Sequence, residues 1–202
     1  GTRFAVAPGA TVTKDFALSP AGTISGVVVD AVTRAPISGI EVLVGTHFGN
    51  RVESTTVTTN AAGAFSRSGL GPGTYFAAIG GTGSPSYVRE IFGGVPCIDA
   101  CGGGINAIDV GTPITVQAGA VTSGINFTLQ PGGRISGTVR RKDTNAALAN
   151  VRVSAWRRVG SEPLQMASAV TNASGAYELV GLPEGAYAIG IESILLNISF
   201  RS

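Results

Sequence analysis

Hydrophobic and polar residues alternate over short stretches of the chain, with the period of a β-strand. Ile40, Val42 and Val44, for example, alternate with Glu41 and Leu43. A period of two places successive side chains on opposite faces of a sheet, so one face is expected to be buried. No stretch combines a helical period with the residues that begin and end helices. The pattern therefore predicts an all-β protein.

Turn-forming residues separate the predicted strands. Residues 60–63 and 172–175 join Asn to Gly across small residues, and residues 71–73 and 183–185 combine Pro with Gly. Asn, Gly and Pro favour tight turns because each accepts or fixes backbone angles that other residues avoid. About seven short strands with a turn every 8 to 12 residues or so describe a small antiparallel Greek-key sandwich.

The same series of strands and turns occurs twice, and the second copy lies 111 or 112 positions after the first. Residues 22–28 recur as 133–139, residues 59–65 as 171–177, and residues 69–75 as 181–187. Constant order at a near-constant offset indicates one module used twice. We expect module 1 at 21–131 and module 2 at 132–202, with a junction at Pro131 and Gly132. The expected core positions are Ile24, Val42, Phe65, Tyr75, Ile135, Val153, Tyr177 and Tyr187.

The copies differ between residues 80 and 119, where module 1 carries a Gly-rich insertion with both cysteines of the chain. Cys97 and Cys101 are four positions apart, a spacing that permits the short Cα separation of a disulfide. Free thiols and a metal site are the alternatives, although the single histidine, His47, lies far upstream. A disulfide would indicate an oxidising compartment. Module 2 lacks the insertion, and its residues 195–200 resemble the closing strand of module 1 at 125–129.

Residues 1–20 resemble the end of a module rather than its beginning. Gly1, Thr2, Val6, Gly9, Ala10, Phe16, Leu18 and Pro20 match Gly111, Thr112, Val116, Gly119, Ala120, Phe127, Leu129 and Pro131. The segment is thus expected to be an orphan closing strand without a module body. Its apolar positions, the candidates for a donated strand, are Phe4, Val6, Val12, Phe16 and Leu18.

Composition narrows the function classes. Only 13% of the residues are charged, the net charge is +2, and the mean hydropathy is +0.31. The charges are scattered, which argues against nucleic acid as a partner. No apolar run approaches the length of about 18 residues that a membrane-spanning helix needs. So few charges leave two alternatives: a surface of small neutral residues, or a surface buried against neighbouring molecules.

The sequence lacks the residue groups that catalysis requires. His47, expected in a loop, has no acidic partner that would build a triad, and no run of alternating Asp residues suggests calcium. We therefore expect no enzyme activity and no cofactor. Trp156 is the one binding candidate, because alternation places it on the face of Arg152 and Arg158, opposite Val153. An exposed Trp beside arginines can stack on a sugar or a protein partner, and the alternative is that a neighbouring strand covers it.

Four motifs occur in order in both copies: Gly-x-Ile-Ser-Gly-x-Val, an alternating Ile/Val strand, Thr-Asn-x-x-Gly-x-Phe/Tyr and Gly-Leu-x-x-Gly-x-Tyr. In these motifs, which together span nearly the whole chain, the sequence resembles the carboxypeptidase regulatory-like domains. That resemblance implies a transthyretin-like sandwich. It also implies a non-catalytic module of a secreted or surface protein, acting as a spacer, folding partner or adhesive unit.

Three functional hypotheses follow. The first is an extracellular structural protein, either a filament subunit assembled head to tail by strand addition or a spacer within a longer tandem array. The second is an adhesive module that binds a glycan or a protein through Trp156. The third is an accessory domain of a secreted hydrolase. The first hypothesis predicts that the isolated chain self-associates. The second predicts saturable sugar binding, and the third predicts a catalytic domain next to this segment in the full protein.

Overall fold

A computed structural model describes residues 3–48, 51–80, 86–97, 111–159 and 162–192 of the chain. Within these ranges the chain forms strands and no helix, as the sequence predicts. The strands of module 1 are β1 (Gly22–Asp30), β2 (Glu41–Phe48), β3 (Arg51–Thr58), β4 (Ala64–Leu70), β5 (Gly73–Ile79), β6 (Glu90–Ile91), β7 (Val95–Pro96), β8 (Ile114–Val116), β9 (Val121–Thr122) and β10 (Phe127–Leu129). The strands of module 2 are β11 (Gly133–Thr138), β12 (Arg152–Val159), β13 (Glu162–Val170), β14 (Ala176–Leu182) and β15 (Ala188–Glu192).

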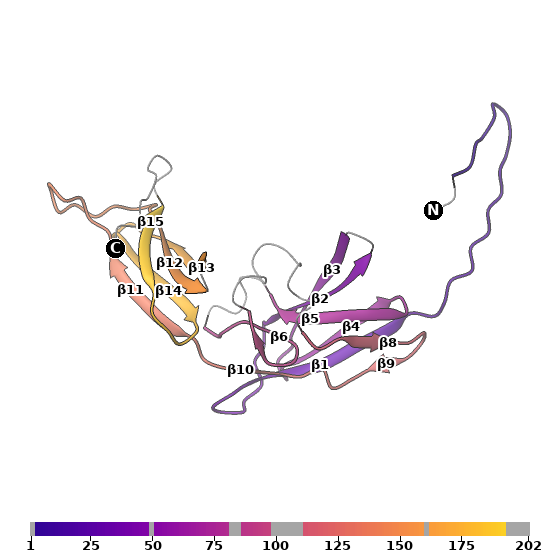
Figure 1. The fold of residues 1–202 in the computed structure, drawn as a ribbon, viewed down its shortest axis with the longest axis horizontal. Helices are drawn as coiled ribbons and strands as arrows, with labels where there is room; N and C mark the ends of the chain where they lie inside the picture. Colours follow the sequence, from indigo (N-terminus) through magenta and orange to yellow (C-terminus); the bar gives the residue numbers. More distant parts are fainter. Residues whose placement is uncertain (1–2, 49–50, 81–85, 98–110, 160–161, 193–202) are drawn as a thin grey trace.

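Module 1 is a sandwich of two sheets (Figure 1). One sheet has the order β10-β1-β4, with β9 also paired to β1, and the other has the order β3-β2-β5-β6-β7, with β8 paired to β5. Most neighbours are antiparallel, but β9 and β10 run parallel to β1, where Val28 pairs with Phe127. Parallel neighbours need a long crossover between them. The closing strands therefore join the far end of the module to its first strand.

The core of module 1 lies between these sheets. Ile24, Val42 and Phe65 are almost completely buried, as predicted. Tyr75 is half-buried against the same core, and its hydroxyl donates to the carbonyl of Gly71 at 3.0 Å. The closing strands contribute as much to this core as β1 does. Ile114, Val116, Ile125, Phe127 and Leu129 are each at most 6% exposed.

The described part of module 2 has the same plan as module 1, with fewer strands. Its described residues form a sheet of β11 and β14 and a sheet in the order β13-β12-β15. Val153 is buried as predicted, whereas Ile135, Tyr177 and Tyr187 are only half-buried around it. The described part of module 2 thus contains no counterparts of β8, β9 and β10, and its core is correspondingly more open.

The predicted Asn turns have the same geometry in both modules. The side-chain oxygen of Asn60 accepts the backbone N–H groups of Ala62 and Ala64, at 2.9 and 3.0 Å. Asn172 accepts those of Ser174 and Ala176, both at 3.0 Å. A short Asn side chain thereby satisfies backbone donors that the turn leaves unpaired. The repeat in the sequence is therefore a repeat of local structure.

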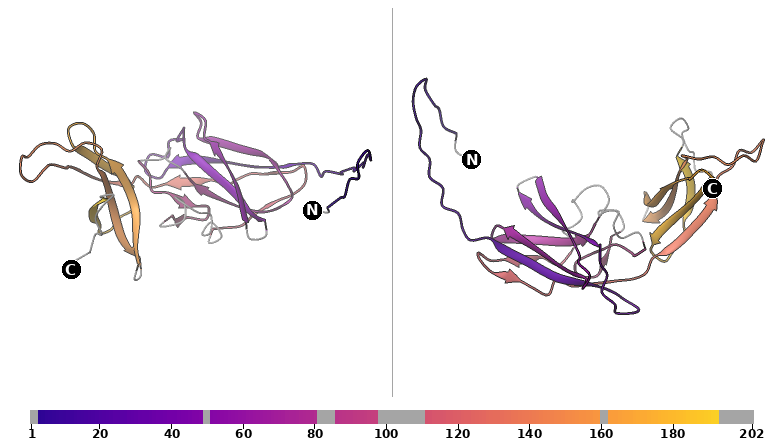
Figure 2. Two further views of the ribbon diagram at one scale, coloured as in Figure 1. Left: turned by 90° about the horizontal axis from the view of Figure 1, so that it is seen from above. Right: turned by 180° about the vertical axis from the view of Figure 1, so that it is seen from behind.

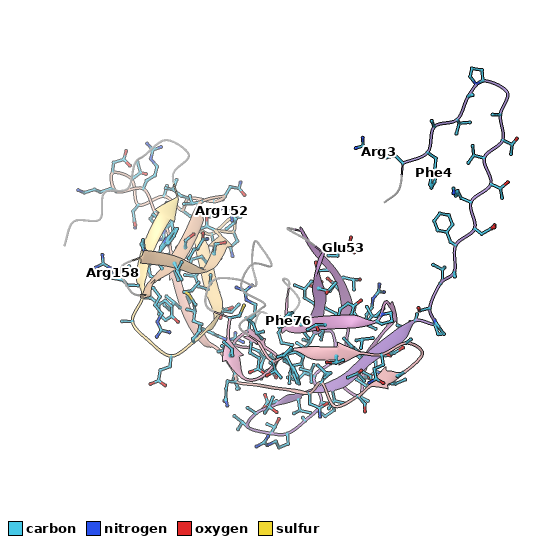
Figure 3. The ribbon with its side chains drawn as sticks, turned by 45° about the vertical axis from the view of Figure 1, so that its right-hand side comes forward. Arg3, Phe4, Glu53, Phe76, Arg152 and Arg158 are labelled. Atoms are coloured by element: carbon cyan, nitrogen blue, oxygen red, sulfur yellow. The ribbon has the colours of Figure 1, made fainter. Side chains whose placement is uncertain are left out.

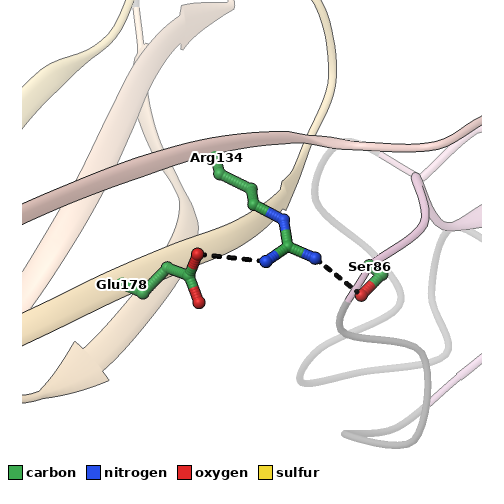
Figure 4. Close-up of polar contacts among 3 residues, drawn as sticks. All are labelled: Ser86, Arg134 and Glu178. Carbon is green, nitrogen blue, oxygen red and sulfur yellow. Dashed lines mark hydrogen bonds and ion pairs between the residues drawn. The ribbon is translucent and has the colours of Figure 1, made fainter.

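Residues at the start of the insertion form hydrogen bonds with the junction between the modules. Gly132 donates to the carbonyl of Ser86 at 2.8 Å, and Val88 donates to that of Gln130 at 2.9 Å. Arg134 of β11 connects the two modules (Figure 4), since its guanidinium lies 3.1 Å from Glu178 and 3.5 Å from the Ser86 hydroxyl. Part of the insertion thus fixes the linker. The last part of the predicted insertion, at Ile114–Val116, belongs to the sandwich as β8.

The modules follow one another end to end, and the N-terminal arm, residues 3–21, leaves module 1 at the pole opposite module 2 (Figures 1 and 2). The arm was expected to be a strand, but it forms none in the single chain. A strand exists only through hydrogen bonds to a neighbour, and the arm has no neighbouring strand among the described residues. The expectation of a strand is therefore wrong for the single chain, in which no described strand pairs with the arm.

Candidate functional site

The N-terminal arm exposes side chains whose counterparts in module 1 are buried. Phe4, Val6, Val12, Phe16 and Leu18 are 49%, 64%, 43%, 84% and 90% exposed. Four of their counterparts, Ile114, Val116, Phe127 and Leu129, are at most 2% exposed. Figure 3 shows Phe4 on the arm, away from both modules. The arm therefore exposes apolar residues at positions that the closing layer of module 1 buries.

The arm already contains the turn of that layer. Gly9 has a φ of 78°, and its counterpart Gly119, between β8 and β9, has a φ of 69°. Ala10 donates to the carbonyl of Ala7 at 3.0 Å, as Ala120 does to that of Gln117 at 3.3 Å. A positive φ favours glycine because a side chain there would be strained. The β8–β9 turn is thus formed in the arm before any partner is present.

Within residues 162–192 and the other described parts of module 2, no strand lies where the closing layer covers module 1. Ile79 on β5 is fully buried, but Ile191, at the same position of β15, is 44% exposed. Its neighbour Ile189 is 41% exposed, whereas the corresponding Ala77 is fully buried. Strand β11 has one described neighbour, β14, while β1 has three. The exposed isoleucines lie on the core face, because they pair with the buried Ala155 and Val153.

Trp156 lies on the outer face of the β13-β12-β15 sheet, on the same side of β12 as Arg152 and Arg158. The indole is half-buried and lies against Gly190 of β15, where an added Cβ would be 3.6 Å from its Nε1. Arg158 is exposed, and Arg152 donates to the Ser168 hydroxyl at 3.3 Å. The neighbouring strand therefore covers part of Trp156, and its role in binding stays a prediction.

A cleft in module 1 was not predicted from the sequence. It has a volume of about 270 Å³ and lies between β2, β3, β4 and the β4–β5 turn; its lining includes Thr46, Glu53, Arg67 and Tyr75. Arg67 pairs with the fully buried Ile24, and its buried Nε has no hydrogen-bond partner among the described residues. The same position in module 2 holds Leu179, which is 1% exposed. Comparing the two copies reveals this arginine, because a core position has become polar in only one.

A second polar group of module 1 is structural. The carboxylate of Asp30 accepts the N–H groups of Val32 and Thr33, at 2.8 and 2.7 Å, and the hydroxyl of Tyr87, at 3.0 Å. The N–H of Thr33 is the main cause that lowers the pKa of Asp30, and desolvation, followed by the contact with Asp30, raises the pKa of Tyr87. Nearby, burial raises the pKa of Glu90. Asp30 thereby attaches the insertion to the end of β1.

The division of the chain into two modules agrees with the comparison to known families. The sequence matches the model of the carboxypeptidase regulatory-like domain twice, over residues 23–130 and over residues 134–194. The chain belongs to the carboxypeptidase regulatory-like domain family. The predicted resemblance and its two tandem copies are therefore confirmed. No curated protein sequence matches this family member at a significant level.

Several solved structures are similar to this carboxypeptidase regulatory-like chain, at low sequence identities and TM-scores. A streptococcal ancillary pilin is 12% identical, with a TM-score of 0.42 over 86% of this chain and 54% of the pilin. The Bacillus anthracis TIE protein is 18% identical, with a TM-score of 0.38 over 86% of this chain and 28% of that protein. A minor pilin of Streptococcus agalactiae is 14% identical, with a TM-score of 0.35 over 85% and 83% of the two chains. The chain thus spans about half, or less, of the first two proteins.

The remaining candidates from the sequence have different outcomes. Cys97 is buried and is not a free thiol, but Cys101 lies outside the described residues, so their disulfide stays a prediction. His47 was expected in a loop, and this was wrong: it pairs with Val52 in the β2–β3 hairpin, which extends further than the sequence suggested. The described residues include no helix that could cross a membrane and no cluster of three metal-ligating side chains.

Proposed function

We propose that this chain is a non-enzymatic structural unit of an extracellular or cell-surface assembly, whose copies associate through the N-terminal arm. One observation carries the proposal: the arm repeats the sequence and the turn of a closing layer, yet its apolar side chains are exposed. Soluble proteins avoid an exposed apolar strand that has no neighbour, because it pairs readily with other chains. The low charge of the chain fits a protein that buries surface against its neighbours.

The energy available to such an association is substantial. Burying one large apolar side chain is worth about 1.5–3 kcal/mol. Phe4, Val6, Phe16 and Leu18 are between 49% and 90% exposed, so burying what is still exposed would yield roughly 4–9 kcal/mol before the costs of association are subtracted. Backbone hydrogen bonds along the added strand would contribute as well, as they do wherever an extended segment joins a sheet edge.

Removal of the arm tests the proposal. We expect the full chain to form concentration-dependent oligomers in sedimentation velocity and elongated particles in negative-stain images. A chain lacking residues 1–20 should be monomeric, and so should the Phe16→Ser, Leu18→Ser variant. These two side chains are 84% and 90% exposed, so their replacement leaves both cores intact. A full chain that stays monomeric at high concentration, or a truncated chain that assembles equally well, would contradict the proposal.

A second candidate function is binding of a glycan through Trp156. The indole keeps one half-exposed face on an open sheet surface, next to the exposed Arg158. Aromatic side chains at such positions contribute strongly to contacts with ligands and partners. Titration against a glycan array should show saturable binding that Trp156→Ala removes. The matched control is Tyr75→Phe in module 1, which should not change it. Binding that is unaffected by Trp156→Ala would assign the glycan to another surface.

A further inference from the structure

We infer that the cleft of module 1 binds a small ligand with a carboxylate at one end and a cationic group at the other. The ligand class is that of arginine, either free or at the C-terminus of a peptide. The inference goes beyond the proposed association and does not depend on it. It rests on two observations: charged groups in the cleft have no partner among the described residues, and module 2 fills the same space with its own side chains.

The cleft has an inner and an outer part. The inner part, of about 270 Å³, lies above the buried Val44 and Leu70 and is lined by Arg67. The outer part, of about 510 Å³, extends over the β4–β5 turn, and both parts share Thr46, Glu53, Gly71 and Tyr75. Glu53 comes from the β2–β3 hairpin (Figure 3). Sites for small molecules have volumes from about 300 Å³ upward, so the two parts together are large enough for a ligand.

The inner end requires an anion. Arg67 is half-buried, its Nε is buried without a hydrogen-bond partner, and its guanidinium forms no ion pair among the described residues. A desolvated charge without a partner is costly. A carboxylate relieves that cost best, because its two oxygens accept two parallel N–H groups of a guanidinium.

The outer end requires a hydrogen-bond donor. The hydroxyl of Thr46 donates to the carbonyl of Thr74 at 2.6 Å, and that of Tyr75 donates to the carbonyl of Gly71 at 3.0 Å. Each hydroxyl has a single hydrogen, so both oxygens can only accept from a ligand. The exposed carboxylate of Glu53 also only accepts, and it adds a negative charge. A cationic group with several N–H donors matches these acceptors.

Module 2 has such a group at the equivalent place. Arg157 stands where module 1 has Thr46, and its guanidinium donates to the carbonyl of Glu184 at 3.1 Å. It lies over the turn, since a Cβ at Gly185 would be 3.1 Å from its central carbon. Desolvation raises the pKa of Tyr187, and the contact with Arg157 opposes that shift. A guanidinium therefore fits the turn and the tyrosine that the two modules share.

The inner part is also filled in module 2. Leu179 and Ala167 stand at the positions of Arg67 and Thr55, and both pack in the core together with Met166. Module 1 replaces these apolar side chains by polar ones. At Gly73, the counterpart of Gly185, an added Cβ would meet nothing closer than the Tyr75 ring, at 3.9 Å. A polar residue at a core position is expected where function requires it. The guanidinium of the ligand thus takes the place of Arg157, and its carboxylate reaches Arg67.

Calorimetric titration of the full chain with matched probes tests the inference. Agmatine is arginine without the carboxylate, and citrulline has a neutral group in place of the guanidinium. We expect L-arginine to bind at least about tenfold more tightly than either, the factor that corresponds to 1.4 kcal/mol. A Gly-Gly-Arg peptide that binds more tightly than L-arginine would identify a chain end as the ligand, and weaker binding would identify the free amino acid. Equal binding of arginine, agmatine and citrulline, or binding of none of them, would overturn the inference.

Two variants assign the ends of the ligand. Arg67→Leu, which copies Leu179, should remove the preference for arginine over agmatine and keep that over citrulline. Glu53→Gln should do the opposite, a split that damage to the fold would not produce. Thr46→Arg, which copies Arg157, should block all three probes. Glu184→Gln is the matched control, because it removes an exposed carboxylate from module 2 and should change nothing. If Arg67→Leu still prefers arginine to agmatine, the assignment of the carboxylate to Arg67 is wrong.

Discussion

Replacing Arg67 by leucine should stabilise module 1. Arg67 lies on the core side of β4 opposite Ile24, and the same position of module 2 holds Leu179, opposite Ile135. The Nε of Arg67 is buried without a hydrogen-bond partner among the described residues, while Leu179 is 1% exposed and packs in its core. The repeat thus supplies a natural example of the substituted side chain in the same fold.

The magnitude follows from two opposing effects. A buried donor without a partner costs about 1–3 kcal/mol, which Arg67→Leu recovers. The methylene stem of arginine also covers apolar surface, so part of that gain is lost with it. We expect module 1 to gain about 1–2 kcal/mol in free energy of unfolding. For a module of this size, each kcal/mol raises the Tm by about 4–8 °C.

Differential scanning calorimetry of the full chain is the assay, because each module can then unfold in its own transition. The reciprocal variant, Leu179→Arg, is the matched control and should destabilise module 2 by roughly 3 kcal/mol or more, since it buries a charge without a partner. An unchanged or lower Tm of module 1 in Arg67→Leu would refute the reasoning, and would mean that the guanidinium has a stabilising contact in the cleft.

Three further predictions concern the core, acid stability and the cysteines. Phe127→Ala should lower the free energy of unfolding in urea by about 3–5 kcal/mol, because it leaves a cavity in the core of module 1. Phe16→Ala should change the stability of the monomer by less than about 0.5 kcal/mol. Equal effects of the two substitutions would contradict the assignment of the arm as an unused copy of the closing layer. The pKa of Asp30 is lowered, so its ionised form stabilises the fold above about pH 4, and that contribution is lost as the pH falls through the lowered pKa. Asp30→Asn should therefore reduce stability at pH 7 and weaken the acid-side decrease seen in a pH series of Tm values, and an unchanged series would disprove the role of Asp30. Intact mass after alkylation should show no label on Cys97 and Cys101 before reduction and two labels after it, and labelling of both thiols without reduction would exclude the disulfide.

The internal repeat allowed several features of this fold to be predicted from the sequence. The period of two at Val42 and Val153, and the turns at Asn60 and Asn172, depend only on residues close in the sequence, and the structure confirms them. The match of the N-terminal arm to the end of module 1 predicted a strand there, and the single chain forms none. The cleft at Arg67 was missed, although comparing that position with Leu179 would have revealed it.

The sequence by itself determined local structure: strand periodicity, turn positions and the use of one module twice. Only the tertiary structure decided which strands pair. Whether Phe127 is buried and Phe16 exposed depends on a neighbouring β1 that is far from Phe127 in the chain, and no local pattern carries that information. Burial depends on the neighbouring strands, so two segments that match at eight residues have opposite environments in one molecule. For the same reason Ile191 is exposed and Ile79 is buried, because among the described residues only Ile79 lies beneath a closing layer.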